Sequence, residues 1–210
     1  VQLEQNNFFQ KSQIVGLEYV LRIDPDRLLA PCYKAVGKSN GSYSYGGWES
    51  RQIAGHSLGH YLSALSEFIE STGNQRCKEK LDYTVKKLAE IQRRDGYIGG
   101  VPSTPFDLAS QGNFNVQRFD LAGYWVPWYS VHKIYAGLID AYKHGKNEQA
   151  LEIVTKMADW AIKLFEKTSE EDFQKMLICE HGGMCKVYAD LYEILGKEQY
   201  LIMAERFVHK

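Results

Sequence analysis

The sequence has no marked excess of charge of either sign and no long apolar run. Lys and Arg total 25 against 26 Asp and Glu, which leaves a formal net charge of −1. A protein that neutralises phosphates needs a basic excess, so this balance argues against binding to nucleic acid. The apolar runs fall far short of the roughly 18 residues that a membrane-spanning helix needs, so we expect no membrane partner.

Cysteine is also scarce, and it is not arranged as a disulfide framework. The four cysteines include no CxxC pair and lack the dense spacing of small secreted proteins. We expect buried, reduced thiols, and because no leader pattern follows Val1 we predict a cytoplasmic protein. An alternative is a zinc site in which Cys179, His181 and Cys185 supply three ligands.

No segment alternates like a strand of useful length; helical periodicity runs through most of the chain instead. The expected helices cover residues 6–23, 27–36, 54–72, 74–94, 125–144, 147–167, 183–195 and 198–209. Asp24 is the expected cap of the second helix, with Pro25 in its first turn. Residues 37–50 and 95–123 show no helical period, so we expect loops there, with at most a short hairpin near residues 97–102.

The last six expected helices form three similar pairs. A glycine turn, at Gly73, Gly145 or Gly196, joins the two helices of each pair. Such a repeated hairpin predicts a solenoid or a closed ring, and the long, unequal, aromatic loops between the pairs favour an (α/α)6 toroid. Six hairpins need at least about 300 residues, so we predict an all-α fold that supplies about half of the ring. Both chain ends are then expected to continue in a longer protein, and the open ring to expose apolar helix faces.

Three clusters of aromatic and polar residues stand at the same relative place, in the segment that leads into the first helix of each pair. The candidate substrate-binding residues are Trp48, Glu49, His56 and His60 in the first cluster, Trp125, Trp128, Tyr129 and His132 in the second, and Glu180 and His181 in the third. Because equivalent loops meet at one end of a toroid, we expect the clusters to form one pocket. Aromatic faces beside polar groups are a pointer to sugars.

The first cluster also permits a metal or a packing role. His56 and His60 share a helix face, but they lack the Glu of an HExxH metal pair. Gly55 and Gly59 precede them, and glycine costs about 1 kcal/mol inside a helix. Their use there indicates close approach of another backbone or of a ligand.

The other two clusters permit structural roles as well. Trp125, Trp128, Tyr129 and His132 share one helix face, so they are candidates for the core as well as for the pocket. Glu180 is a candidate general acid or base, or a hydrogen-bond acceptor for a sugar hydroxyl. Its alternative role is that of a helix-start carboxylate, stabilised by the helix dipole.

Several short segments carry a joint resemblance to a known family. They are DRLLAP (26–31), GGWE (46–49), GHSLGHYLSA (55–64), QRRDGY (92–97), VPWY (126–129), HK (132–133), AGL (136–138) and GGM (182–184). Together they resemble the β-L-arabinofuranosidases of glycoside hydrolase families 127 and 146, and the match covers nearly the whole chain. The resemblance implies that residues 1–210 are the N-terminal portion of one (α/α)6-barrel catalytic domain, with no internal boundary.

The resemblance also implies a chemistry. Members of the family are retaining exo-glycosidases that act on β-linked L-arabinofuranose in plant glycans. Their nucleophile is a cysteine held on Zn²⁺ by a Glu and further cysteines, and a Glu serves as acid/base. These ligands lie in Glu-x-Cys and Cys-Cys segments that this chain lacks, so we expect them after Lys210. We therefore expect zinc in the full-length enzyme and no metal bound by this chain.

The resemblance assigns sugar contacts to His132 and to the His56/His60 region, and it places Glu180 and His181 in a loop that feeds another pocket contact. From its chemistry alone, Glu180 stays a candidate acid/base. The expected partners are an arabinofuranose-containing glycan and the remainder of the same polypeptide, without which we expect no hydrolysis. Two other functions fit the residues alone. One is a helical-repeat module that binds a protein; the other is an α/α-toroid sugar enzyme without zinc, such as an epimerase or a lyase.

Overall fold

The computed structural model describes residue 3, residues 7–181 and residues 183–210. Helices dominate this part of the chain. The α-helices are α1 (Phe8–Arg22), α2 (Pro25–Ala35), α3 (His56–Thr72), α4 (Gln75–Ile91), α5 (Thr104–Ser110), α6 (Pro127–Lys143), α7 (Glu148–Leu164), α8 (Glu170–Met176), α9 (Gly183–Leu195) and α10 (Glu198–Arg206). A 3-10 helix, η1, spans Gly47–Ser50, and the short strands are β1 (Val116–Gln117), β2 (Asp120–Leu121) and β3 (Tyr124–Trp125). None of the described helices is long and apolar enough to cross a membrane.

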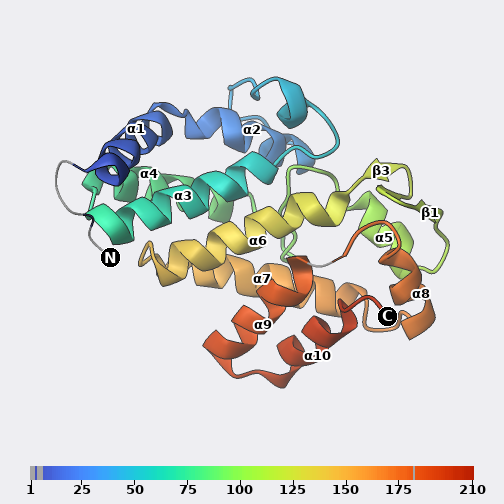
Figure 1. Cartoon of the computed structure of the whole chain (residues 1–210). Coiled ribbons are helices and arrows are strands. Elements are labelled where there is room, and N and C mark those ends of the chain that lie inside the picture. Colours follow the sequence, from blue (N-terminus) through green and yellow to red (C-terminus); the bar gives the residue numbers. More distant parts are fainter. Residues whose placement is uncertain (1–2, 4–6, 182) are drawn as a thin grey trace.

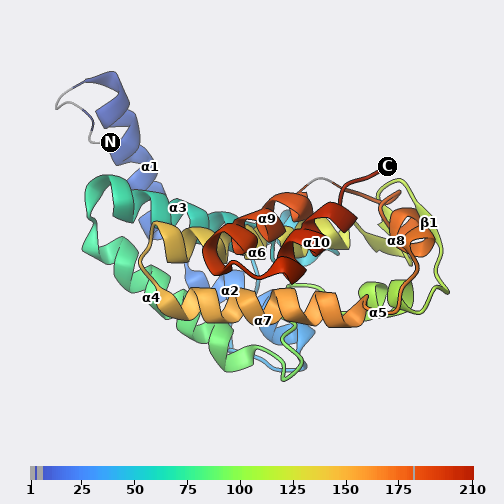
Figure 2. The same cartoon turned by 90° about the horizontal axis from the view of Figure 1, so that it is seen from below.

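The predicted helix pairs are helical hairpins that stand next to one another. They are α3 with α4, α6 with α7, and α9 with α10 (Figure 1). The first helices of the hairpins form one layer, because α6 packs between α3 and α9. The second helices form another layer, because α7 contacts both α4 and α10. Figure 2 shows α7 alongside α4. This two-layer arrangement confirms the predicted all-α fold, in which hairpins build about half of an (α/α)6 toroid.

Side chains at the helix starts explain where the helices begin. The Asp24 carboxylate accepts a hydrogen bond from the Asp26 N–H, and Pro25 occupies the first turn of α2, as predicted. Asn74 caps α4 and Asn147 caps α7 in the same way. Directly before Asn74, α3 ends at Gly73, whose φ of 66° suits glycine.

Two glycines let α3 and α6 cross at backbone distance. A Cβ on Gly59 would lie 2.0 Å from the carbonyl oxygen of Lys133. A Cβ on Gly137 would lie 2.4 Å from the carbonyl oxygen of Gly59. At the start of α3, a Cβ on Gly55 would lie 2.8 Å from the N atom of Gly100. The close approach expected at Gly55 and Gly59 is therefore confirmed, and it fixes the start of α6 relative to the start of α3.

The long loop between α4 and α6 contains more structure than the sequence indicated. The hairpin expected near residues 97–102 is wrong; the strands lie at residues 116–125 and form an antiparallel sheet in the order β1-β2-β3. Residues 95–97, which follow α4, form a turn in which the Asp95 carboxylate accepts a hydrogen bond from the Tyr97 N–H. Helices α5 and α8 were not predicted, because seven residues are too few to show a helical period.

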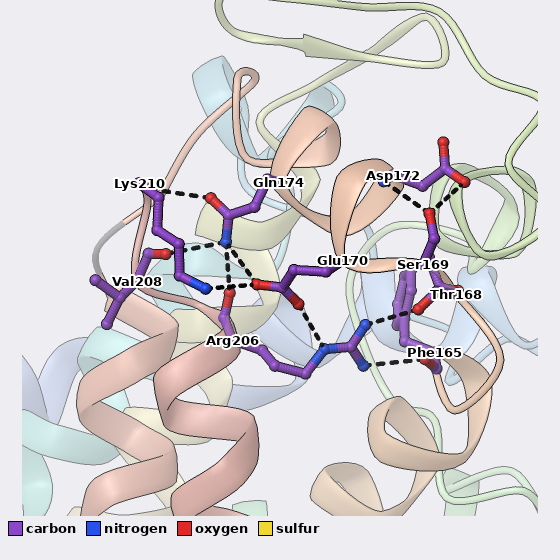
Figure 3. A network of polar contacts seen from close by, with 9 residues as sticks. All are labelled: Phe165, Thr168, Ser169, Glu170, Asp172, Gln174, Arg206, Val208 and Lys210. Atoms are coloured by element: carbon purple, nitrogen blue, oxygen red, sulfur yellow. Dashed lines mark hydrogen bonds and ion pairs between the residues drawn. The ribbon is translucent and has the colours of Figure 1, made fainter.

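A polar network fastens the end of α10 to α8 and to the end of α7 (Figure 3). The Arg206 guanidinium donates to the carbonyl oxygens of Phe165 and Thr168, at 3.0 and 2.9 Å. Glu170 forms ion pairs with Arg206 and Lys210. These contacts hold the adjacent Phe207 in the aromatic core, where its ring lies 5.0 Å from that of Trp128.

At the other end of the described chain, α1 projects from the body of the molecule (Figure 2). Several of its apolar side chains are exposed, namely Phe8, Phe9, Ile14, Val15 and Tyr19. An exposed apolar helix face of this kind is what the open half-ring was expected to leave uncovered.

Candidate functional site

A cavity of about 500 Å³ lies where the segments that precede α3, α6 and α9 meet. It is lined by Trp48, Ile53, Phe119, Trp125, Val126, Trp128, Tyr129, His132, Lys133, Glu180, His181, Gly183, Met184 and Phe207. The three clusters thus come together in space. The structure brings seven of the predicted substrate-binding residues to this cavity: Trp48, Trp125, Trp128, Tyr129, His132, Glu180 and His181. Their contact with a substrate stays a prediction.

Glu180 reaches across from the segment before α9 to the first turn of α6. Its carboxylate accepts hydrogen bonds from the N–H groups of Trp128, at 2.6 Å, and Tyr129, at 2.9 Å. The sequence suggested a role at the start of its own helix; the structure places the carboxylate at the start of α6 instead, where the helix dipole favours negative charge. Burial raises the pKa of Glu180 to about 7 against the lowering effect of the two N–H donors.

This pKa leaves Glu180 near the midpoint of its titration at neutral pH. Such a value suits a general acid or base. Both of its oxygens, however, are engaged by backbone donors, so in this structure the carboxylate positions the start of α6. Glu180 therefore combines the position of a helix-start carboxylate with a pKa that suits an acid/base residue.

His132 lies one turn further along α6. Burial, helped by the positive charges of Lys133 and Lys186, lowers the pKa of His132 to about 4. The imidazole is therefore neutral at pH 7 and has both a donor and an acceptor nitrogen, which suits a hydroxyl group. Its ring packs directly on Gly183, where a Cβ would lie 2.7–2.8 Å from the ring atoms. Only glycine leaves room for the ring at this place.

Glu49 and His56 form a buried ion pair at the start of α3. The Glu49 carboxylate accepts from the N–H groups of Gly55 and Ser57, at 2.8 and 2.9 Å, and lies 2.9 Å from Nδ1 of His56. Burial alone would raise the pKa of Glu49, but the hydrogen bonds from His56 and the backbone outweigh it and lower the pKa. The bond to Glu49 in turn raises the pKa of His56. Both shifts favour the charged form of the pair, which holds the backbone at the start of α3.

These residues lie behind the cavity rather than on its wall. The His56 ring is 6.0 Å from that of Trp48 and 5.9 Å from that of Tyr129, both of which line the cavity. His60 is exposed, 6.3 Å from His56. Of the ten predicted residues, Glu49, His56 and His60 are the three that the structure does not bring to the cavity wall.

The aromatic residues divide into a floor and a rim. Trp128 is only 2% exposed; its ring packs 4.5 Å from Phe106, and its Nε1–H donates to Met176 Sδ. It therefore belongs to the core and presents one face to the cavity. Trp48 is 57% exposed and meets Trp125 edge to face at 6.5 Å, so this pair forms the rim.

Sequence reasoning missed several residues of the cavity wall. Lys133, whose ammonium lies 4.8 Å from the centre of the Tyr129 ring, has a signal in its four-residue spacing from that tyrosine. Phe119 sits at a turn with φ of 67°, and its N–H donates to the Cys179 carbonyl oxygen at 2.9 Å. Phe207 comes from the end of α10. No local pattern connects either phenylalanine with the clusters.

The described residues contain no group of three or more His, Cys, Asp and Glu side chains that could hold a metal ion. The alternative zinc site of Cys179, His181 and Cys185 therefore has no support. Burial, together with the charge of Glu180, raises the pKa of Cys179 to about 12, so this thiol stays protonated at neutral pH. Of the GGM segment, Gly182 lies outside the described residues.

Comparisons with known proteins point to one family. The family model described as "Beta-L-arabinofuranosidase, GH127 catalytic domain" matches residues 1–210. A solved GH127 β-L-arabinofuranosidase from Geobacillus stearothermophilus T6 is similar in fold, with a TM-score of 0.66 at 16% identity over 97% of this chain and 31% of its own. Another solved GH127 β-arabinofuranosidase has a TM-score of 0.61 at 16% identity, over 96% of this chain and 31% of its own.

At this identity the two structures show the fold. The chain spans 31% of the length of each of these solved relatives. No curated protein sequence matches it.

Proposed function

This chain belongs to the family of the β-L-arabinofuranosidase GH127 catalytic domain, and on that premise we propose that the protein containing it is a glycoside hydrolase acting on β-L-arabinofuranosides. The observation that carries the proposal is the cavity at which three separate segments meet. Its volume of about 500 Å³ lies within the usual range for small-molecule sites. It combines aromatic faces with a few polar groups, as a sugar ring requires.

Each of these groups has a task in the proposed site. Neutral His132 exchanges hydrogen bonds with a ring hydroxyl, donating from one nitrogen and accepting at the other. Trp48 and Trp125 at the rim cover the C–H face of the sugar. Glu180 holds the first turn of α6, the helix that carries Tyr129 and His132. The pKa of Glu180, about 7, makes this residue available for proton transfer.

The finer chemistry of the proposal follows from the resemblance to this family. We expect an exo-acting, retaining enzyme with plant glycans as substrates, in which double displacement preserves the anomeric configuration. Zinc and the nucleophilic cysteine are expected after Lys210. The described residues include no group of side chains that fits a metal site.

Family membership favours hydrolysis over the other functions that the residues allowed. A helical-repeat module that binds a protein would not need a neutral histidine and a carboxyl group of raised pKa in an aromatic cavity. An epimerase or lyase without zinc would be revealed by turnover that survives chelation. The remainder of the polypeptide as a partner and the cytoplasmic location stay predictions.

The test uses the full-length protein and a synthetic aryl β-L-arabinofuranoside. We expect release of L-arabinose, and a loss of roughly tenfold to a hundredfold in kcat/KM in His132→Ala, because the hydrogen bond to the sugar is removed. The matched control is His144→Ala, which removes a histidine just beyond the other end of α6, outside the cavity. Full activity in His132→Ala would overturn the assigned role, and absence of L-arabinose release by the unaltered protein would overturn the proposed function.

A further inference from the structure

A second cavity, of about 790 Å³, is lined by residues of α2, of the loop after α2 and of the segments that precede α3 and α6. The two cavities are lined by neighbouring residues of the same two segments, residues 48–54 and residues 124–125. Gln52 ties these segments together. Its Nε2 donates to the Gly123 carbonyl oxygen at 3.1 Å, and its Oε1 accepts from the Trp125 N–H at 3.0 Å. The walls of the two cavities are therefore built on the same two backbone segments.

The second cavity carries positive charge that nothing in the described chain neutralises. Lys34, Lys38 and Arg51 line it, all are exposed, and none of the three forms an ion pair or a side-chain hydrogen bond with another described residue. The one carboxylate among its lining residues is Glu49, whose oxygens are engaged by His56 and by the N–H groups of Gly55 and Ser57. The three cations are thus available to an anion from outside.

The loop on one side of this cavity is anchored rather than loose. The Asn40 side chain donates to the Asp26 carbonyl oxygen at 2.8 Å and accepts from the Ser42 N–H at 3.1 Å. The Arg27 guanidinium donates to the Tyr43 carbonyl oxygen at 3.2 Å. The Tyr43 ring is nonetheless 89% exposed. An exposed aromatic ring on a fixed backbone is ready to stack on a ligand without a large ordering cost.

We propose that the second cavity binds a carboxylate-bearing sugar, a uronic acid residue of the glycan. The unpaired cations match its carboxylate, and Arg51 can bind both carboxylate oxygens at once. Pro31, Val101 and Tyr43 offer apolar faces to the C–H side of the ring. This inference rests on the proposed function, because a uronic acid is expected there only if the substrate is a glycan.

The test measures binding by calorimetry with the full-length protein and needs no hydrolysis, so its failure leaves the test of the proposed function untouched. The probe is a trimer of galacturonic acid, and its neutral counterpart is a trimer of galactose. We expect the charged trimer to bind more tightly than the neutral one. The double variant K38Q/R51Q should weaken binding of the charged trimer at least about tenfold, because two charge-assisted contacts are lost.

The matched control is K163Q/K167Q, which removes two cations that line neither cavity and should leave binding unchanged. Because Lys38 and Arg51 are exposed, the double variant should keep the thermal stability of the unaltered protein. Inorganic phosphate forms a third arm. Absence of binding of the charged trimer, unchanged binding in K38Q/R51Q, an equal loss for the neutral trimer, or displacement of the charged trimer by phosphate at equal concentration would each overturn the proposal.

Discussion

A carboxylate holds the start of α3 and another holds the start of α6, but their pKa values are shifted in opposite directions. At each start, a carboxylate from a preceding or distant segment accepts hydrogen bonds from two backbone N–H groups: Glu49 at α3 and Glu180 at α6. Glu49 has a charged partner in His56, and its pKa is lowered. Glu180 forms no ion pair with a described residue, and burial raises its pKa to about 7.

The different pKa shifts indicate a structural role for Glu49 and a role in the cavity for Glu180. At the start of α3, the contact with His56 lowers the pKa of Glu49 and raises that of His56, and the pair lies behind the cavity. At the start of α6, Glu180 has no cationic partner among the described residues and has a pKa of about 7, and it lines the same cavity as His132. Perturbed carboxylates of the second kind gather at functional sites.

The largest effect is expected where the two helices cross. In Gly59→Ala the new Cβ would lie 2.0 Å from the Lys133 carbonyl oxygen, so α3 and α6 must separate and both helix starts must shift. We expect the free energy of unfolding to fall by about 3 kcal/mol, measured by chemical denaturation. The control is Gly46→Ala, because no atom lies within 4 Å of its Cβ and its φ of −72° is ordinary. Equal stability of the two variants would contradict the crossing described here.

The next effect is at the start of α3. Glu49→Gln removes the charge that His56 needs and turns an amide group toward a hydrogen-bond donor. We expect a loss of about 2–3 kcal/mol at pH 7, because a partner of a buried ion pair is removed. Denaturation at pH 7 checks this value. A Glu49→Gln protein as stable as the unaltered one would show that the pair does not fix the helix start.

The pH dependence of stability distinguishes the two carboxylates. The pKa of Glu180 is raised from 4.5 to about 7, so the native state holds the proton more tightly, and the contribution of Glu180 falls as the pH rises from 4.5 to 7. The lowered pKa of Glu49 has the opposite sign: its contribution is lost as the pH falls below 4.5.

Glu180→Gln should therefore remove a decline on the order of 3 kcal/mol between pH 4.5 and 7. Glu49→Gln should leave that decline in place and remove a loss at lower pH. Each variant is the control for the other, and stability measured across pH 3–8 reads both. Identical pH profiles for the two variants would remove the distinction between the helix starts.

The smallest effect on stability is expected at the cavity rim. Trp48 is 57% exposed, so Trp48→Ala should change the free energy of unfolding by less than about 0.5 kcal/mol. Binding of L-arabinose, followed by calorimetry, should nevertheless weaken, because the aromatic face over the sugar is lost. Unchanged binding would limit the ligand contacts to the cavity floor.

Much of this architecture is readable in the sequence, because it depends on local signals. Asp24 with Pro25, the asparagines that cap α4 and α7, and the glycine turns specify the hairpins through contacts within a few residues. The strands before α6 could not be predicted, because each is two residues long and the turns place Phe119, Ala122 and Val126 at positive φ. Such a backbone is held by its surroundings rather than by its own sequence pattern.

The candidate site likewise has features that the sequence predicts and features that it does not. Cluster position predicted that Trp125, His132 and Glu180 meet, because equivalent loops converge in a toroid. The contact of Glu180 with the start of another helix was not predictable, since it spans about fifty residues, from Tyr129 to Glu180. Nor does spacing reveal that Glu49 faces the backbone of its own helix start while Trp48 faces the cavity.

The central claim is that the segments before α3, α6 and α9 form one sugar-binding cavity. The most direct test is a crystal structure of the full-length protein with L-arabinose. The account predicts a furanose ring in the 500 Å³ cavity, with a hydroxyl group within hydrogen-bond distance of the His132 imidazole and a C–H face against Trp48 or Trp125. A sugar bound elsewhere, with this cavity empty at saturating L-arabinose, would contradict it.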